Sequence, residues 1–159
     1  MPDCHVYNSD GACRMSESDR RASSGVLLRY NEITLAELGV YLGDASNNEA
    51  EYDGVLRALQ HAVSMIDHSS VCFRVDSLLV ARQLQGLWRC RAVHLHSVYE
   101  ACLDFLRELR SRHGHDCVKV EHVYREFNAS ADALANEVLN EYNPRQHADG
   151  VVVNRAWQP

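Results

Sequence analysis

The chain has 159 residues, a net charge of −6 and 46% hydrophobic residues. This length suits one domain with a single core, and the composition is that of a globular protein rather than a disordered tail. No apolar run approaches the roughly 20 residues that span a bilayer, so we expect no membrane partner. The amino terminus has no basic start followed by an apolar stretch, which predicts no secretory signal and a cytoplasmic, intracellular location.

The six cysteines form no CxxC pair, so the ligand spacing of a zinc site is absent. We interpret them mainly as reduced thiols that pack as small hydrophobic side chains. The acidic net charge argues mildly against a nonspecific nucleic-acid binder, because such proteins usually carry a basic face. Any nucleic-acid contact must therefore come from local positive charge.

Three strands are predicted first, over residues 4–9, 24–30 and 33–42, with a turn at Asp10-Gly11 and a tight connection at Asn31-Glu32. They are expected to form an antiparallel meander. Ser46 and Glu49 have the spacing of a capping box, which predicts a helix that begins there. Apolar residues then recur at helical spacing from position 55 to position 66.

The second half alternates strands and helices. We predict a central strand over 71–75, helices over 77–85 and 93–112, a last strand over 117–123, and a final helix capped by Asn128. This order predicts an α/β fold with a mixed five-stranded sheet, three antiparallel strands and then parallel strands, flanked by helices. The domain is expected over 1–143. In the tail, 144–159, Val151–Val153 either pack as a short added strand or belong to a disordered end.

Four acidic residues lie at the edges of these elements. Asp10 and Asp76 each follow a predicted strand, whereas Glu51 and Asp132 lie in the first turns of predicted helices. If they converge on one sheet edge, their charges repel unless divalent cations neutralise them. Oxygen ligands suit magnesium or manganese, and two such ions about 4 Å apart can serve phosphoryl displacement. The alternative is that each acid is only a turn residue or a favourable helix-terminal charge.

Four sequence blocks around these acids occur in a recognisable order and spacing. They are Asp10-Gly11-Ala12, NNEAEY at 47–52, Asp76–Val80 with Gln83, and His122–Arg125 with Asn128, Ala131-Asp132 and Leu134-Ala135. Together they cover residues 4 to about 140. The chain resembles the type 1 ribonuclease H family, in its compact archaeal, mycobacterial and plant-like branch.

The resemblance implies an endonuclease, a hydrolase that cuts the RNA strand of RNA–DNA hybrids and leaves 5′-phosphate and 3′-hydroxyl ends. It implies two Mg²⁺ ions, with Mn²⁺ as a substitute, held by the four acids. By analogy Asp10 bridges both ions, Asp132 helps to hold the ion that activates water, and Glu51 and Asp76 serve the other ion. Glu51 and Asn47 are similar in place to residues that contact the RNA 2′-hydroxyl.

The chain departs from the family in two segments. Residues 14–24 (RMSESDRRASS) contain neither the glycine nor the proline of the usual turn, although Ser16 is still expected near a sugar. The basic protrusion of the enterobacterial enzymes is absent as well. In its place, Arg89 and Arg91 beside Trp88 are expected to contact the DNA strand. The alternative is that Trp88 packs into the core.

Arg125 lies where many relatives carry a histidine, in the loop before the final helix. Because its guanidinium stays protonated, we expect an electrostatic role at the scissile phosphate rather than proton transfer. The alternative is a surface arginine paired with Glu126 or Glu121. Asn128, within the same block, is also expected to contact substrate.

The main interpretation is a monomeric hybrid-specific nuclease without an obligate protein partner. Two alternatives remain: the ribonuclease H portion of a retroelement polyprotein, and a catalytically inactive hybrid-binding module. The presence of all four acids argues against the inactive module.

Overall fold

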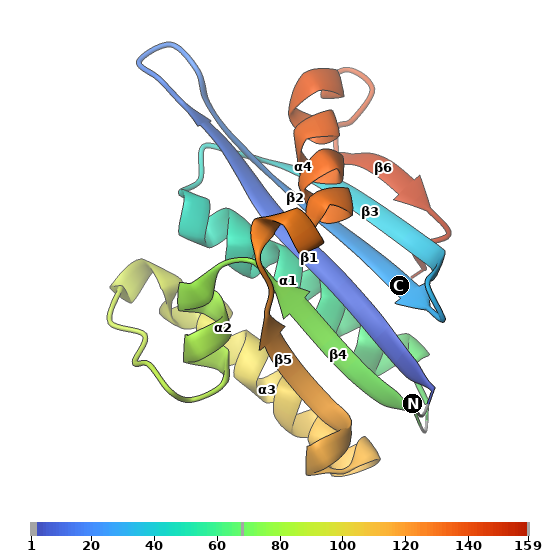
Figure 1. Cartoon of the computed structure of the whole chain (residues 1–159). Coiled ribbons are helices and arrows are strands. Elements are labelled where there is room, and N and C mark those ends of the chain that lie inside the picture. Colours follow the sequence, from blue (N-terminus) through green and yellow to red (C-terminus); the bar gives the residue numbers. More distant parts are fainter. Residues whose placement is uncertain (1–2, 68, 159) are drawn as a thin grey trace.

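The computed structural model describes residues 3–67 and 69–158, which form a mixed sheet with helices on both faces (Figure 1). The strand order is β5-β4-β1-β2-β3-β6. Strands β1, β4 and β5 run parallel, whereas β1, β2, β3 and β6 are antiparallel neighbours. The expected mixed α/β architecture is confirmed. Among the described residues, no helix is long and apolar enough to cross a membrane.

The first two strands are longer than predicted. β1 spans Cys4–Met15 and β2 spans Arg20–Tyr30, and they remain paired as far as Met15 opposite Arg20. The predicted turn at Asp10-Gly11 is therefore wrong, because Asp10 lies inside β1 opposite Gly25. These strands continue into a long hairpin, drawn in blue at the top of Figure 1. β3 spans Ile33–Gly43, close to the prediction.

Two glycines of these strands allow helices to approach the sheet closely. A Cβ atom on Gly11 would lie 2.6 Å from the Ala50 carbonyl carbon, and one on Gly25 would lie 2.7 Å from the Ala131 carbonyl oxygen. Neither distance is tolerable between real atoms, so only glycine fits both positions. Gly11 thereby serves the packing of a helix on β1 rather than a turn.

The helices cover the two faces unequally. α1 (Asn47–Met65) and α3 (His96–His113) lie on one face and α4 (Ala129–Glu141) on the other, as Figure 1 shows. The predicted capping box is confirmed: the Glu49 backbone N–H donates to Ser46 Oγ at 3.1 Å and the Ser46 N–H donates to Glu49 Oε1 at 3.0 Å. The remaining main elements are β4 (Ser70–Val75), α2 (Leu78–Leu84) and β5 (Val118–His122).

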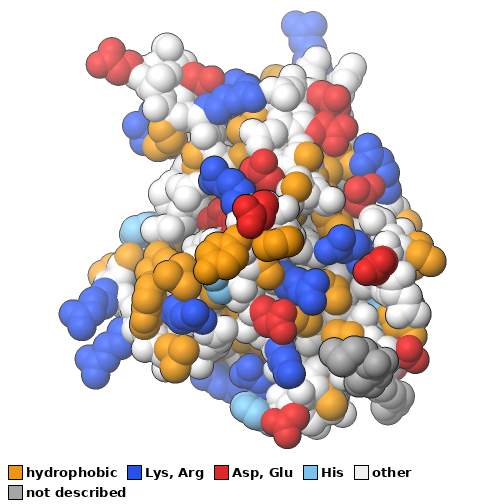
Figure 2. Space-filling view, in the orientation of Figure 1, with side chains coloured by type: hydrophobic (Ala, Val, Ile, Leu, Met, Phe, Trp, Pro, Cys, Tyr) orange, Lys and Arg blue, Asp and Glu red, His pale blue; other side chains and the backbone are white. Residues whose placement is uncertain are grey.

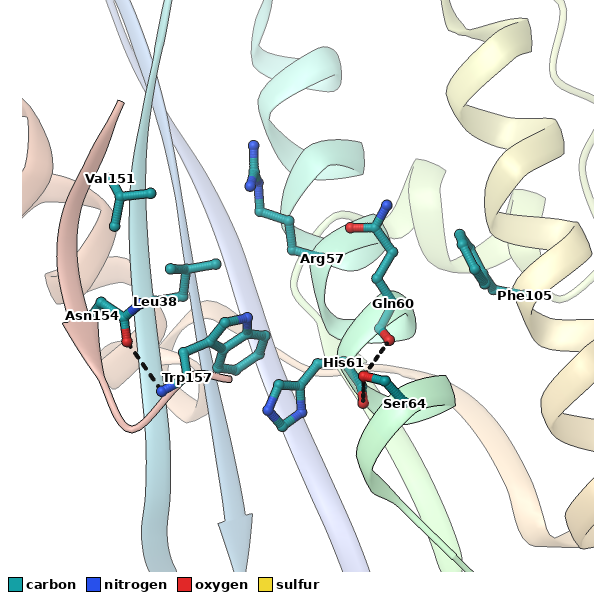
Figure 3. A pocket seen from close by; sticks show the side chains of 9 residues that line it. All are labelled: Leu38, Arg57, Gln60, His61, Ser64, Phe105, Val151, Asn154 and Trp157. Atoms are coloured by element: carbon teal, nitrogen blue, oxygen red, sulfur yellow. Dashed lines mark hydrogen bonds between the residues drawn. The ribbon is translucent and has the colours of Figure 1, made fainter. Parts of the chain in front are cut away.

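The tail adds a sixth strand, so the expected five-stranded sheet is corrected. β6 (Val151–Arg155) pairs with β3, and a disordered end over the valine triplet is wrong. Beyond it, the Trp157 side chain is 9% exposed and its ring centroid lies 4.1 Å from that of His61. His61 is in turn hydrogen-bonded through Nδ1 to the Tyr7 hydroxyl at 2.7 Å. Trp157 and His61 border a pocket of about 560 Å³ between α1 and β6 (Figure 3).

Candidate active site

Three of the four predicted acids come together where β4 ends, beside the middle strands of the sheet. Asp10 comes from β1, Glu51 from the start of α1, and Asp76 from the residue that follows β4. One carboxylate oxygen from each lies within 4.8 Å of the others. The parallel pairing of β1 with β4 places Asp10 and Asp76 at adjacent positions, and the close approach of α1 at Gly11 supplies Glu51. We call these three residues the carboxylate cluster.

The carboxylate cluster is buried and incompletely hydrogen-bonded. Asp10 is 2% exposed and Glu51 is 5% exposed. Each member of the cluster has one buried carboxylate oxygen without a hydrogen-bond partner. Burial raises the pKa of Asp10, and the neighbouring charge of Asp76 adds to the increase. Burial also raises the pKa of Glu51, followed by the charge of Asp10. Unpaired buried carboxylates are unfavourable unless they are protonated or bind a cation.

Asp132 lies beside the carboxylate cluster rather than within it. It occupies the first turn of α4 and is close enough to contribute to the raised pKa of Asp10. The Asn136 side-chain amide donates to its Oδ1 at 3.3 Å and to its backbone carbonyl at 2.9 Å. The structure thus brings together three predicted ligands at short range and places the fourth next to them.

The donor set fits a hard divalent cation. All the available ligand atoms are carboxylate oxygens, the type that Mg²⁺ and Mn²⁺ prefer. A cation could bind these unpartnered oxygens, and its charge would offset both the burial and the mutual repulsion that raise the pKa values of Asp10 and Glu51. The residues present therefore fit the expected metals.

Apart from Glu51 and Asn128, the predicted substrate contacts are exposed. Asn47 is exposed at the first position of α1, and Ser16 is exposed near the tip of the β1–β2 hairpin. Trp88 is 45% exposed, so the alternative that it packs into the core is wrong. Arg89 and Arg91 are exposed beside it. All three side chains are available for a ligand.

Arg125 is exposed in a short 3-10 turn, Arg125–Phe127, just before α4. Among the described residues no ion pair joins it to Glu121 or Glu126, and Glu121 instead pairs with Arg74 at 3.3 Å. The surface-pairing alternative therefore lacks support. Two neighbours that the sequence analysis missed are Tyr124 and Phe127, which are 70% and 67% exposed. Two aromatic residues in a short polar loop are the sequence feature that could have indicated an exposed contact surface there.

Asn128 departs from expectation. It occupies the N-cap position of α4, but its side chain makes no capping hydrogen bond. The residue is 1% exposed, and its side chain is bonded to Asn8 and to the Ser9 carbonyl. Both ends of its amide are hydrogen-bonded within the protein, which leaves no group for a direct side-chain contact with substrate, so the expectation is corrected. Asn8 was missed because a polar residue in a strand gives no sign of its partner.

Figure 2 shows basic and acidic side chains interspersed on the face that carries α4 and β5. Hydrophobic side chains gather in the middle of this face and near α2. No continuous basic surface appears there, in keeping with the acidic net charge. Positive charge on this face is therefore local rather than continuous.

Comparison with known proteins agrees with this architecture. The family described as "Reverse transcriptase-like" matches residues 8–138. A curated ribonuclease HI of Halobacterium salinarum is 35% identical over 137 residues, which cover 86% of this chain and 64% of that protein. A curated bifunctional protein of Mycobacterium tuberculosis is 28% identical over 135 residues, or 85% of this chain and 35% of that protein. The chain thus spans about a third to two thirds of the length of these curated relatives.

Solved structures give the same result. The crystal structure of the Halobacterium salinarum RNase H1 superposes with a TM-score of 0.72 at 33% identity, covering 88% of this chain and 98% of that one. The amino-terminal RNase H domain of the mycobacterial protein gives 0.74 at 28% identity, covering 87% and 94%. The fold and its acidic site therefore define a ribonuclease H-like nuclease domain. The chain belongs to the type 1 ribonuclease H family, in its archaeal and mycobacterial branch.

Proposed function

We propose that this protein is an endonuclease that hydrolyses the RNA strand of RNA–DNA hybrids, with two Mg²⁺ or Mn²⁺ ions, and leaves 5′-phosphate and 3′-hydroxyl ends. The observation that carries the proposal is the carboxylate cluster: one oxygen from each of its three residues lies within 4.8 Å of the others, and each residue also has a buried oxygen without a hydrogen-bond partner. A related RNase H1, LC11, has been crystallised in complex with an RNA/DNA hybrid; it is 29% identical with a TM-score of 0.69. We propose the same substrate class here.

Within this proposal each acid has a defined task. Asp10, Glu51, Asp76 and Asp132 hold the cations, which supply Lewis-acid activation of water and neutralise charge at the phosphate. Glu51, Asp76 and Asp132 all influence the pKa of Asp10, so Asp10 is near enough to the other three acids to hold cations together with them. Arg125 is exposed beside α4 and stabilises negative charge on the phosphate.

The remaining residues hold the hybrid. Asn47 and Glu51, one turn apart at the start of α1, face the RNA 2′-hydroxyl, the group that distinguishes RNA from DNA. Trp88, Arg89 and Arg91 contact the DNA strand through stacking and phosphate pairing. Ser16 lies near a sugar. We further propose that the protein acts as a monomer in the cytoplasm.

A cleavage assay tests the proposal. A hybrid labelled on its RNA strand should be cut in Mg²⁺ or Mn²⁺ and left intact in EDTA, and RNA–RNA and DNA–DNA duplexes should remain uncut. Asp10→Asn should lower turnover at least ~1,000-fold, because a lost metal ligand removes several kcal/mol of transition-state stabilisation. Mass analysis of the fragments should show 5′-phosphate and 3′-hydroxyl ends.

Asp53→Asn is the matched control. Asp53 is also a carboxylate of α1, but its Oδ2 accepts hydrogen bonds from Ser24 at 2.6 Å and Arg57 at 2.7 Å. Because it is satisfied within the protein, its replacement should leave turnover near wild type. An Asp10→Asn variant with undiminished turnover would contradict the proposal. Hybrid binding by the wild type without metal-dependent cleavage would favour an inactive binding module instead.

A further inference from the structure

Two buried amide side chains join the strand that carries Asp10 to the helix that carries Asp132. Asn8 on β1 and Asn128 at the N-cap of α4 are each 1% exposed. Asn8 Nδ2 donates to Asn128 Oδ1 at 3.0 Å. Asn128 Nδ2 donates in turn to the backbone carbonyl of Ser9 at 2.8 Å. These contacts cross about 120 positions of sequence and form a direct link between β1 and α4.

Asn128 reaches the peptides of both acids. The Ser9 carbonyl that it binds belongs to the peptide group that continues into Asp10. Its own backbone carbonyl accepts the N–H of Asp132 at 3.1 Å, the first hydrogen bond of the helix. One residue therefore fixes the backbone from which the Asp10 carboxylate projects and the turn from which the Asp132 carboxylate projects.

This amide pair is fully satisfied, in contrast to the adjacent carboxylate cluster. Arg29 donates to Asn8 Oδ1 at 2.7 Å, so the side-chain oxygen of Asn8 also has a partner. Neither amide leaves a buried nitrogen or oxygen without a partner, although Asp10 nearby has one such oxygen. A buried polar network with all partners present restricts geometry, because any displacement leaves a group unpaired.

We propose that Asn128, oriented by Asn8, is a positioning residue that sets the location of the Asp132 carboxylate relative to Asp10. The inference rests on the proposed metal-dependent function and names which of this chain's own residues prepare the site. Asp132 lies outside the carboxylate cluster, so its approach depends on where the first turn of α4 is held. Replacement of a residue that orients a metal ligand typically lowers metal affinity about 10- to 100-fold.

The test measures Mn²⁺ binding by calorimetry without nucleic acid, alongside hybrid cleavage. Asn128→Ala should weaken Mn²⁺ binding about 10- to 100-fold, the range for lost partners of metal ligands. It should lower kcat by a similar factor and leave KM for the hybrid near wild type. Asn8→Ala should have a smaller effect of the same kind, because Asn128 keeps its bond to Ser9.

Ser23→Ala provides the matched control. Ser23 is fully buried, and its Oγ donates to the Ala135 carbonyl at 2.6 Å, so it also anchors α4 to the sheet, but away from the metal-binding turn. Its replacement should lower the melting temperature and leave Mn²⁺ affinity unchanged. A general loosening of α4 would instead make Ser23→Ala and Asn128→Ala alike.

Three results would overturn the inference. The first is an Asn128→Ala variant with wild-type Mn²⁺ affinity and kcat. The second is a raised KM alone, which would indicate a substrate contact. The third applies if Asn128→Ala does not fold: it is a folded Asn8→Ala variant that binds Mn²⁺ as tightly as the wild type. If the wild type binds Mn²⁺ but does not cut hybrids, the proposed function is overturned. The Mn²⁺ affinities of the wild type and the asparagine variants would still test the role of Asn128.

Discussion

Two regions of this molecule bury ionisable side chains, and they treat them in opposite ways. His61 is 4% exposed, yet it is bonded to the Tyr7 hydroxyl and packed against Trp157. Burial lowers the pKa of His61, so it is held as a neutral partner within the core. Asp10 and Glu51 are equally buried, but each has an oxygen without any partner. The first region is complete as folded, whereas the second requires protons or cations.

The contrast shows that cavity size is a poor guide to function in this protein. The pocket beside His61 and Trp157 measures about 560 Å³, and Figure 3 shows side chains of several elements around it. Its buried histidine already has a partner in the protein. The carboxylate cluster is distinguished instead by buried carboxylate oxygens that have no hydrogen-bond partner in the protein. Unpaired buried charge is costly, so its persistence indicates a ligand.

Apart from the loss of a metal ligand, replacement of Arg125 should have the largest effect on turnover. This residue lies on the side of the molecule that we expect to be functional. Arg125→Ala should lower turnover about ten- to a thousandfold, the range for a lost electrostatic donor, with nearly unchanged stability. Arg125→Lys should recover only part of the loss, since lysine lacks the planar fork of the guanidinium. The pH–rate profile should contain no limb assignable to this residue. Steady-state kinetics with the labelled hybrid measure all three.

Arg107→Ala is the control for that series. Arg107 is an exposed arginine of α3 that pairs with Asp104, on the opposite face of the sheet. Its removal should leave turnover unchanged. If Arg125→Ala also keeps wild-type turnover, the loop before α4 has no catalytic role.

The comparison also predicts how stability depends on pH without metal. Raised pKa values mean that the native protein binds more protons than the unfolded chain, so the stability they contribute is present below about pH 4. It is lost as the pH rises through the raised values. In EDTA the melting temperature should therefore decline from about pH 4 to about pH 10, because burial raises the pKa of Asp10 to about 7 and that of Glu51 to about 10. Mn²⁺ should reduce this decline, because it binds the deprotonated carboxylates.

Asp10→Asn should flatten the same pH profile in EDTA and raise the melting temperature at neutral pH, because one buried charge is gone. Asp53→Asn, at a carboxylate that Ser24 and Arg57 satisfy, should keep the wild-type slope. Equal slopes in the wild type and Asp10→Asn would show that the carboxylate cluster carries no excess charge.

Removal of a polar partner in the His61 region should lower stability, whereas Asp10→Asn should raise the melting temperature at neutral pH. Tyr7→Phe leaves Nδ1 of a buried histidine without its partner and should lower stability by about 1–3 kcal/mol. Turnover, measured well below the melting temperature, should stay near wild type. The double variant Tyr7→Phe with His61→Phe removes both polar partners and should regain part of the lost stability. Chemical denaturation of the wild type, Tyr7→Phe, His61→Phe and the double variant gives the coupling free energy between the two side chains. Losses that simply add would mean that this hydrogen bond contributes nothing to stability.

The sequence predicted the mixed sheet and its helices, but not every strand pairing within it. Asp10 and Asp76 meet because β1 pairs in parallel with β4, although the two residues are 66 positions apart in the sequence, and the order of strands and helices predicted this parallel pairing. The pairing of β6 with β3 depends on contacts over more than 100 positions, which no local pattern encodes. The Asn8–Asn128 bond is equally distant in sequence. An Asp-Gly pair usually marks a turn, which is why the sequence predicts one at Asp10-Gly11. In the structure Gly11 instead lies within β1 and allows α1 to pack closely against it.

The smallest effect that we expect concerns the exposed segment around Trp88. Its side chains belong neither to the buried carboxylate cluster nor to the buried Tyr7–His61 hydrogen bond. Arg89→Glu combined with Arg91→Glu should raise KM for the hybrid several-fold and lower kcat less, because phosphate contacts position substrate without taking part in the reaction. With a net charge of −6, the plot of log affinity against log salt should indicate release of only a few counterions. The reversed variant should have a flatter slope still. Arg107→Glu with Arg112→Glu makes the same charge change on α3, where both arginines are exposed, and should leave KM unaltered. If the two double variants change KM equally, the effect comes from net charge alone and the proposed DNA contact beside Trp88 is wrong.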